Sequence, residues 1–103
     1  DQPHPAAVRK VLDACLKAKT AEACDALRDL YDKGYGARDI VGTVFKVCRS
    51  HEGMSETIKL EFLKEIGFAH MKIADGCATL LQLLGMVGKL CRTVDRARAA
   101  SES

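Results

Sequence analysis

The sequence lacks the features that mark membrane, secreted and nucleotide-binding proteins. No apolar run reaches the roughly eighteen residues that a membrane span needs. The N-terminal stretch DQPHPAAVRK has no apolar core of the kind that a secretory signal peptide carries. A glycine-rich loop followed by Lys-Ser/Thr, which would cradle a nucleoside triphosphate, is also missing. The sequence does not start with Met, and we expect it to be an excised or processed piece of a longer protein.

An excess of one charge is lacking as well. The 103 residues carry 16 Lys and Arg against 14 Asp and Glu, a formal net charge of +2. The two signs are interspersed along the chain, as on an ordinary solvated surface. Charge alone therefore gives no reason to expect nucleic-acid or membrane binding. A chain of this length is expected to form one domain with one core.

Closely spaced cysteine pairs are absent. The sequence has five cysteines, an odd number, and no Cys-x-x-Cys motif. Each falls on an apolar helical face, which favours small buried side chains in a reducing compartment over disulfides or a metal site. A secreted protein is therefore disfavoured. The five are Cys15, Cys24, Cys48, Cys77 and Cys91.

Apolar residues recur at steps of three and four along most of the chain, and no strand pattern appears. This spacing places side chains on one face of an α-helix. We predict five helices with short links, at about residues 5–19, 20–33, 36–50, 55–75 and 77–91. The predicted fold class is all-α, a five-helix bundle.

The expected organisation has three parts. Residues 1–4 form an extended lead-in, because Pro3 and Pro5 each bias the preceding residue away from helix. Residues 5–92 form the helical domain. Residues 93–103 form a polar, alanine-rich tail that we expect to fray.

The fourth and fifth helices organise the rest of the chain. The fourth has one inward stripe, formed by Ile58, Phe62, Leu63, Ile66, Ala69 and Ile73. The predicted inward face of the fifth is formed by Leu80, Leu81, Leu84, Val87, Gly88 and Cys91.

Leu83, Met86 and Leu90 lie partly outside the predicted inward face of the fifth helix. A helix that is apolar on most sides has to be covered on more than one. One interpretation is that the three residues are internal to a two-layered core. The other is that they contact a neighbouring protein.

Residues suited to catalysis or metal binding do not form a recognisable pattern. His4 lies in the lead-in, His51 in a loop and His70 in a helix, whereas a zinc site needs about four converging ligands. Glu61 and Glu65 lie four residues apart, but nearby lysines favour a solvated face over a catalytic dyad. We therefore expect no catalytic, cofactor-binding or metal-binding residue, and no enzymatic activity in this chain.

A helix-turn-helix is the main alternative. The second and third predicted helices are joined by KGYGA, a short glycine-containing turn. The third helix is mostly apolar and leaves Arg38, Lys46 and Arg49 to face outward, which favours a solvated surface over base reading. An autonomous DNA-binding domain stays open as an alternative, and its binding would weaken steeply with salt. A catalytic domain of unknown type is a third hypothesis.

Four segments carry a resemblance to a known family. DQPHP, LYDKGYGARDIVGTVFKVCRS, TLLQLLGMVGKLC and especially IKLEFLKEIGFAHMKIADG resemble the C-terminal domain of eukaryotic replication factor C small subunits, clamp loaders of the AAA+ class. The resemblance covers residues 1 to about 92. The chain departs from the family at Gly36, where relatives often have a serine that caps the helix, and at Tyr31, where they tend to have tryptophan.

The resemblance implies a structural role. Full-length subunits of this family are AAA+ ATPases that use ATP and Mg²⁺, but the modules that bind them are not in this sequence. The C-terminal helical domain joins those of the other four replication factor C subunits in a collar. The heteropentamer loads the sliding clamp onto primer-template DNA during replication and repair. The resemblance thus implies a nuclear oligomerisation module that meets clamp and DNA only through the whole complex.

The resemblance and the surplus apolar surface lead to an expected subunit interface. We expect it at the outer side of the fifth helix and at the outer edge of the fourth. The interface residues expected are His70, Lys72, Leu83, Met86 and Leu90.

Overall fold

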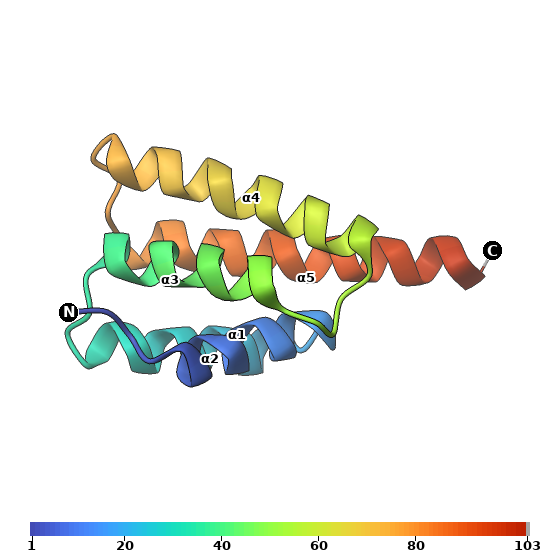
Figure 1. Ribbon diagram of the computed structural model, residues 1–103, viewed down its shortest axis with the longest axis horizontal. Helices are drawn as coiled ribbons and strands as arrows, with labels where there is room; N and C mark the ends of the chain where they lie inside the picture. Colours follow the sequence, from blue (N-terminus) through green and yellow to red (C-terminus); the bar gives the residue numbers. More distant parts are fainter. Residues whose placement is uncertain (103) are drawn as a thin grey trace.

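The computed structural model describes residues 1–102 and confirms the predicted all-α fold (Figure 1). No helix of this part of the chain is long and apolar enough to cross a membrane. The five helices are α1 (Pro5–Leu16), α2 (Thr20–Asp32), α3 (Ala37–Ser50), α4 (Glu56–Ala74) and α5 (Leu80–Glu102).

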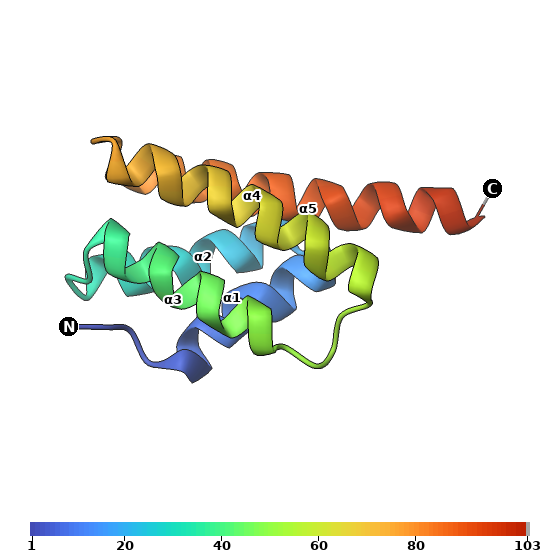
Figure 2. The ribbon, with the colours of Figure 1, turned by 45° about the horizontal axis from the view of Figure 1, so that its top comes forward.

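The helices pack as two layers around one core. Figure 2 shows α4 and α5 side by side above α1, α2 and α3. Within the lower layer α1 contacts both α2 and α3, and between layers α3 contacts α4 while α2 and α1 contact α5. One side of α4 and one side of α5 are therefore left facing away from the rest of the chain.

Local capping explains where the first and fourth helices begin. His4 Nδ1 accepts a hydrogen bond from the Ala6 amide at 3.1 Å, and Pro5 occupies the first helical position. Ser55 Oγ accepts from the Ile58 amide at 3.2 Å. These contacts place the end of the lead-in and the start of α4 where the sequence predicts them.

Two other helix boundaries differ from expectation. α1 ends at Leu16, before residue 19, because Ala18 adopts a left-handed conformation with φ of 55°. Thr20 has a side chain of the kind that often caps a helix, but it is the first residue of α2. Lys19 occupies the cap position without a side-chain hydrogen bond. At α3, Gly36 precedes the helix and, having no side chain, offers no capping hydrogen bond.

The expectation that residues 93–103 form a separate fraying tail is wrong over its described part. α5 continues to Glu102, and Val94 is only 6% exposed. The Arg98 guanidinium donates to the carbonyl oxygens of Leu16 at 3.2 Å and Lys17 at 3.4 Å. It thereby serves carbonyl groups at the end of α1 that have no partner within their own helix. Ser103 lies outside the described residues.

The inward stripe of α4 is as predicted. Phe62, Ile66, Ala69 and Ile73 are buried, and Ile58 and Leu63 are half-buried against the same core. The core is continuous through both layers and includes residues of all five helices.

The predicted inward face of α5 is wrong by about a quarter turn of the helix. Leu83 and Leu90 are fully buried and Met86 is 2% exposed, so all three lie inside the chain's own core. The residues buried on α5 are Leu83, Met86, Val87, Leu90, Cys91 and Val94. The physical reason is that α4 covers α5 from the side while α1 and α2 cover it from below.

The cysteines are all free thiols, and three of them are buried: Cys15, Cys48 and Cys91. Cys77 is exposed in the link before α5, contrary to its expected place on an apolar face. Burial raises the pKa of the Cys48 thiol to about 11, although Lys59 opposes the shift. Burial, with Cys91 close by, raises the pKa of Cys15 further.

Candidate protein interface

The large apolar side chains exposed in the described chain all lie on α4 and α5. Leu60, Phe68 and Met71 of α4 are 65%, 50% and 64% exposed, and Leu81 of α5 is 79% exposed. Exposed apolar residues scattered singly are normal, but a contiguous group generally marks a binding site. We call the side of these two helices that faces away from the other three the outer α4–α5 face.

Helical spacing explains why these residues point outward. The buried row of α4 contains Phe62, Ile66 and Ile73. Leu60 and Met71 lie about half a turn away from that row, at 3.6 residues per turn. Leu81 stands in the same relation to the buried residues of α5. Packing the core therefore forces these side chains into solvent.

None of these four residues was among the expected interface residues. The signal that could have found Leu60, Phe68 and Met71 was present, because they are apolar and fall outside the inward stripe of α4. Leu81 was predicted to face inward and is the most exposed of the four.

Two of the five expected interface residues lie at the surface of α4. His70 and Lys72 are exposed, and neither side chain forms a hydrogen bond or ion pair within residues 1–102. Leu83, Met86 and Leu90 are enclosed by the chain's own helices and are not available to a partner while this packing persists. The structure therefore does not bring the expected five residues together on one surface.

Charged residues occupy the end of the outer α4–α5 face that lies far from the link between the helices. They line a depression of about 220 Å³. Lys64 forms an ion pair with Glu61 at 3.2 Å. The residues that line the depression are Glu61, Lys64, Glu65, Lys89, Arg92, Thr93 and Arg96.

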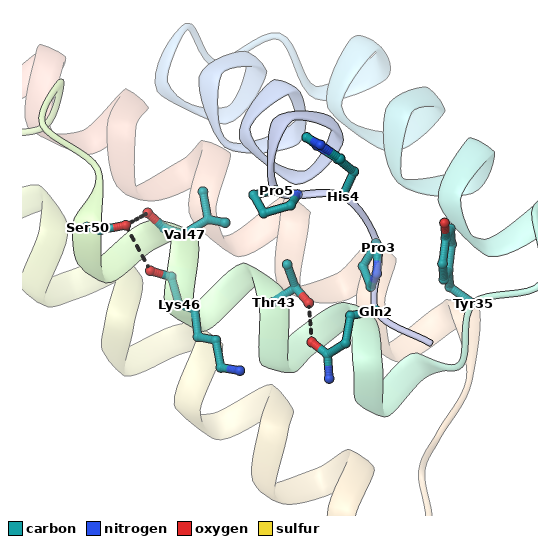
Figure 3. A pocket seen from close by; sticks show the side chains of 9 residues that line it. All are labelled: Gln2, Pro3, His4, Pro5, Tyr35, Thr43, Lys46, Val47 and Ser50. Carbon is teal, nitrogen blue, oxygen red and sulfur yellow. Dashed lines mark hydrogen bonds between the residues drawn. The ribbon is translucent and has the colours of Figure 1, made fainter.

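A second concavity lies between the N-terminal lead-in and α3 (Figure 3). Its volume is about 610 Å³ and it opens widely to solvent. Pro3, Pro5, Tyr35 and Val47 supply apolar walls, and Lys46 lies at its edge with no ion pair within residues 1–102.

The other polar groups of this groove are already used by the protein itself. Ser50 Oγ lies 3.2 Å from the Lys46 carbonyl oxygen, and His4 caps α1. Thr43 Oγ1 lies 2.9 Å from the Asp39 carbonyl oxygen and 3.0 Å from Gln2 Oε1. One hydroxyl proton cannot serve two acceptors, so both contacts are satisfied when the Gln2 amide turns to donate to Thr43. The groove holds the lead-in on α3 and offers no arrangement for catalysis.

The buried histidine His51 has a structural role that sequence reasoning missed. Its ring is 3% exposed, and its Nδ1 accepts a hydrogen bond from the Gly53 amide at 2.9 Å. Nε2 therefore carries the proton and donates to Asp13 Oδ1 at 2.8 Å. The pair ties the link between α3 and α4 to α1, with both ring nitrogens committed.

No group of side chains that could hold a metal ion is assembled within residues 1–102. In that part of the chain, no three His, Cys, Asp or Glu side chains lie close enough together to bind one ion. Glu61 is paired with Lys64, as the sequence suggested for a solvated face.

The basic side chains of α3 are largely engaged by the protein. Arg38 donates to the Ala74 carbonyl oxygen at 3.3 Å, and the Arg49 guanidinium lies 5.7 Å from the centre of the Phe45 ring. Lys46 is exposed beside the groove. For α3 to contact DNA through these side chains, Arg38 would have to release the Ala74 carbonyl oxygen of α4, and Arg49 would have to leave the Phe45 ring.

The fold and its exposed face define an all-α packing module, in which five helices close one core and leave an apolar outer side. Residues 3–89 match the Replication factor C C-terminal domain family, and the chain belongs to this family.

Relatives in plants and yeast agree with this assignment. Replication factor C subunit 2 of Arabidopsis thaliana is 46% identical over 99 residues, which are 96% of this chain and 29% of the relative. Subunit 4 of Oryza sativa is 46% identical over 100 residues, and subunit 4 of Saccharomyces cerevisiae is 40% identical over 98 residues. The chain thus spans about a third of the length of the relatives it matches.

Proposed function

We propose that the chain is the oligomerisation module, or collar domain, of a replication factor C small subunit. In this role it holds a heteropentameric, ATP-dependent clamp loader together. The observation that carries the proposal is the outer α4–α5 face of a chain that belongs to this family. An exposed apolar group of this kind is costly in water and is suited to burial against another protein.

The partners follow from the family and from the names of the relatives. They are the other four replication factor C subunits, which this domain contacts directly. The sliding clamp, primer-template DNA, ATP and Mg²⁺ engage parts of the whole protein that this chain does not include. The chain itself performs no reaction, and the assembled complex works in the nucleus, in DNA replication and repair.

His70 and Lys72 belong to the proposed subunit contact. Both are exposed on α4, the helix that also carries Phe68 and Met71. Free side chains at the border of an apolar surface are typical of the polar rim of a protein interface.

The test is a reconstitution of the five-subunit complex with the full-length subunit and with the same subunit lacking this domain. The mass of the complex and its clamp-loading activity are measured. We expect the truncated subunit to yield no pentamer and no loading. A pentamer of the mass expected for the truncated subunit, with normal loading, would contradict the proposal. Salt-sensitive binding of the isolated domain to primer-template DNA, without such an assembly role, would favour a DNA-binding domain.

A further inference from the structure

On the outer α4–α5 face, three of the four exposed apolar side chains lie toward the link between the helices, and the charged depression lies farther from it. The fourth apolar residue, Leu60, lies at the charged end. α4 and α5 run antiparallel and are joined by a short link, so the end of α4 lies beside the start of α5 (Figure 1). Phe68, Met71 and Leu81 are therefore grouped near the link. Lys89, Arg92 and the other residues of the charged depression lie farther from it.

The charged end of this face carries charge that the chain does not neutralise. Glu61 and Lys64 are paired with each other. The depression then retains three cations, Lys89, Arg92 and Arg96, against the single carboxylate of Glu65. None of the three cations forms an ion pair or a side-chain hydrogen bond within residues 1–102.

Glycines in the same face leave room for a close neighbour. Gly67 of α4 and Gly85 and Gly88 of α5 lie inside helices, where glycine is less stable than alanine. A Cβ added at any of the three would meet nothing within 4 Å, so packing within the chain does not require glycine there. The apolar and charged groups beside them make a surface that another helix could approach closely.

We infer that the outer α4–α5 face docks a helical surface of a different protein chain, with apolar side chains opposite Phe68, Met71 and Leu81 and carboxylates opposite Lys89, Arg92 and Arg96. This inference rests on the proposed function and names the kind of surface that a sister subunit presents. Charge complementarity decides the occupant, because the unpaired cations need carboxylates when water is removed.

A second copy of this chain fits the face less well. It presents the same excess of positive charge, so a two-fold contact would set cations against cations or against apolar side chains. Nucleic acid could neutralise Arg92 and Arg96 but would leave Leu81 and Met71 uncovered.

Site-specific photo-crosslinking tests the identity of the occupant. A photoreactive amino acid replaces Leu81 or Arg92, one at a time, in the full-length subunit within the assembled five-subunit complex. We expect both positions to crosslink to one other subunit, in a helical segment that contains apolar residues and Asp or Glu. Crosslinks to a second copy of this chain, to DNA, or to no protein would overturn the inference.

Charge reversal tests the charged end. We expect Arg92→Glu with Arg96→Glu to weaken binding to the crosslinked subunit by about tenfold or more. Reversing two exposed charges elsewhere, Lys10→Glu with Arg28→Glu, makes the same change in net charge and should leave this binding unchanged. If the two double variants weaken binding equally, the effect comes from the net charge of the chain and not from a contact at Arg92 and Arg96. That result would refute the assigned face.

A glycine pair tests the close approach. Gly85→Ala should raise the Tm of the 103-residue chain by roughly 4 °C and weaken binding to the crosslinked subunit. Gly42→Ala on α3 also meets open space and should raise the Tm similarly without affecting binding. If the pentamer needs this domain but the Gly85 and Arg92 variants bind normally, the inference fails and the proposed function stands. If the pentamer forms without the domain, the proposed function fails as well.

Discussion

At the scale of single residues, buried polar and titratable groups are held by specific partners. His51 is enclosed, yet its two ring nitrogens are used by Gly53 and Asp13. The packing beside it is tight: a Cβ added at Gly53 would come within 2.7 Å of the His51 ring. For the buried thiols of Cys15 and Cys48, burial disfavours the thiolate and raises the pKa.

We predict that His51→Ala destabilises the chain by about 2 kcal/mol. The substitution removes the ring and leaves the Gly53 amide without its acceptor. The free energy of unfolding in urea measures the effect. His70→Ala, the same change at an exposed histidine, should stay within about 0.5 kcal/mol of the parent. Equal stabilities of the two variants would show that the His51 contacts contribute nothing.

A second prediction concerns alkaline pH. The pKa of Cys48 is raised from 9.0 to about 11, so the folded state holds this proton more tightly than the unfolded state. The resulting stabilisation is complete below pH 9 and is lost as the pH rises through 11. Urea unfolding at pH 8 and at pH 10.5 should therefore show a fall in stability. Cys48→Ala should lose less stability between pH 8 and pH 10.5 than the parent does. If the variant and the parent lose the same amount, other titrating groups cause the loss.

At the scale of elements, neighbouring helices decide where α5 ends and which side it buries. Its last three turns are rich in alanine and arginine, which favour helix, but they carry few large apolar residues that would hold such a helix against a core. Val94 and Arg98 attach this part of α5 to the rest of the chain, Arg98 through the carbonyl end of α1.

Two truncations test this role of the α5 extension. A chain ending at residue 92 loses the burial of Val94 and the Arg98 contacts, and we expect it to be less stable by about 2 kcal/mol. A chain ending at residue 99 keeps both and should unfold at nearly the parental temperature. Thermal unfolding followed by circular dichroism compares them. Matching Tm values for the shorter truncation and the parent would mean that the extension does not stabilise the fold.

At the scale of the whole molecule, folding and the proposed association use opposite sides of the same helix. Leu83 of α5 closes the core between the layers, whereas Leu81 lies on the outer α4–α5 face. Two leucines two residues apart therefore lie in opposite environments, one in the core and one in solvent. The domain keeps exposed apolar surface that its own stability does not require.

This separation predicts opposite behaviour for two similar substitutions. Leu83→Asp places a charge in the core and should unfold the chain, at a cost of about 4 kcal/mol or more. Leu81→Asp should leave the fold intact and reduce incorporation of the full-length subunit into the pentamer. Circular dichroism reads folding and size-exclusion chromatography with mass measurement reads incorporation. A folded Leu83→Asp chain would contradict the core assignment, and normal incorporation of Leu81→Asp would argue against the outer face as the contact.

The sequence was sufficient for the helices and for the core side of α4. Phe62, Ile66 and Ile73 form one stripe, so periodicity has a single solution there. On α5 the stripes that contain Leu81 and Leu83 overlap, and periodicity does not choose between them. For this reason the sequence predicts an apolar interface at Leu83, Met86 and Leu90. It does not predict the exposed apolar residues of α4, Leu60, Phe68 and Met71.

Local sequence determined the number, type and most of the boundaries of the helices, because periodicity, prolines and the capping residues His4 and Ser55 act within a few residues of the chain. Tertiary structure alone decided which side of α5 is buried, how far α5 continues and that His51 binds Asp13. These depend on contacts between segments distant in sequence, and in particular on α4 covering one side of α5 while α1 and α2 cover another. The outer α4–α5 face is what remains when those contacts have been made.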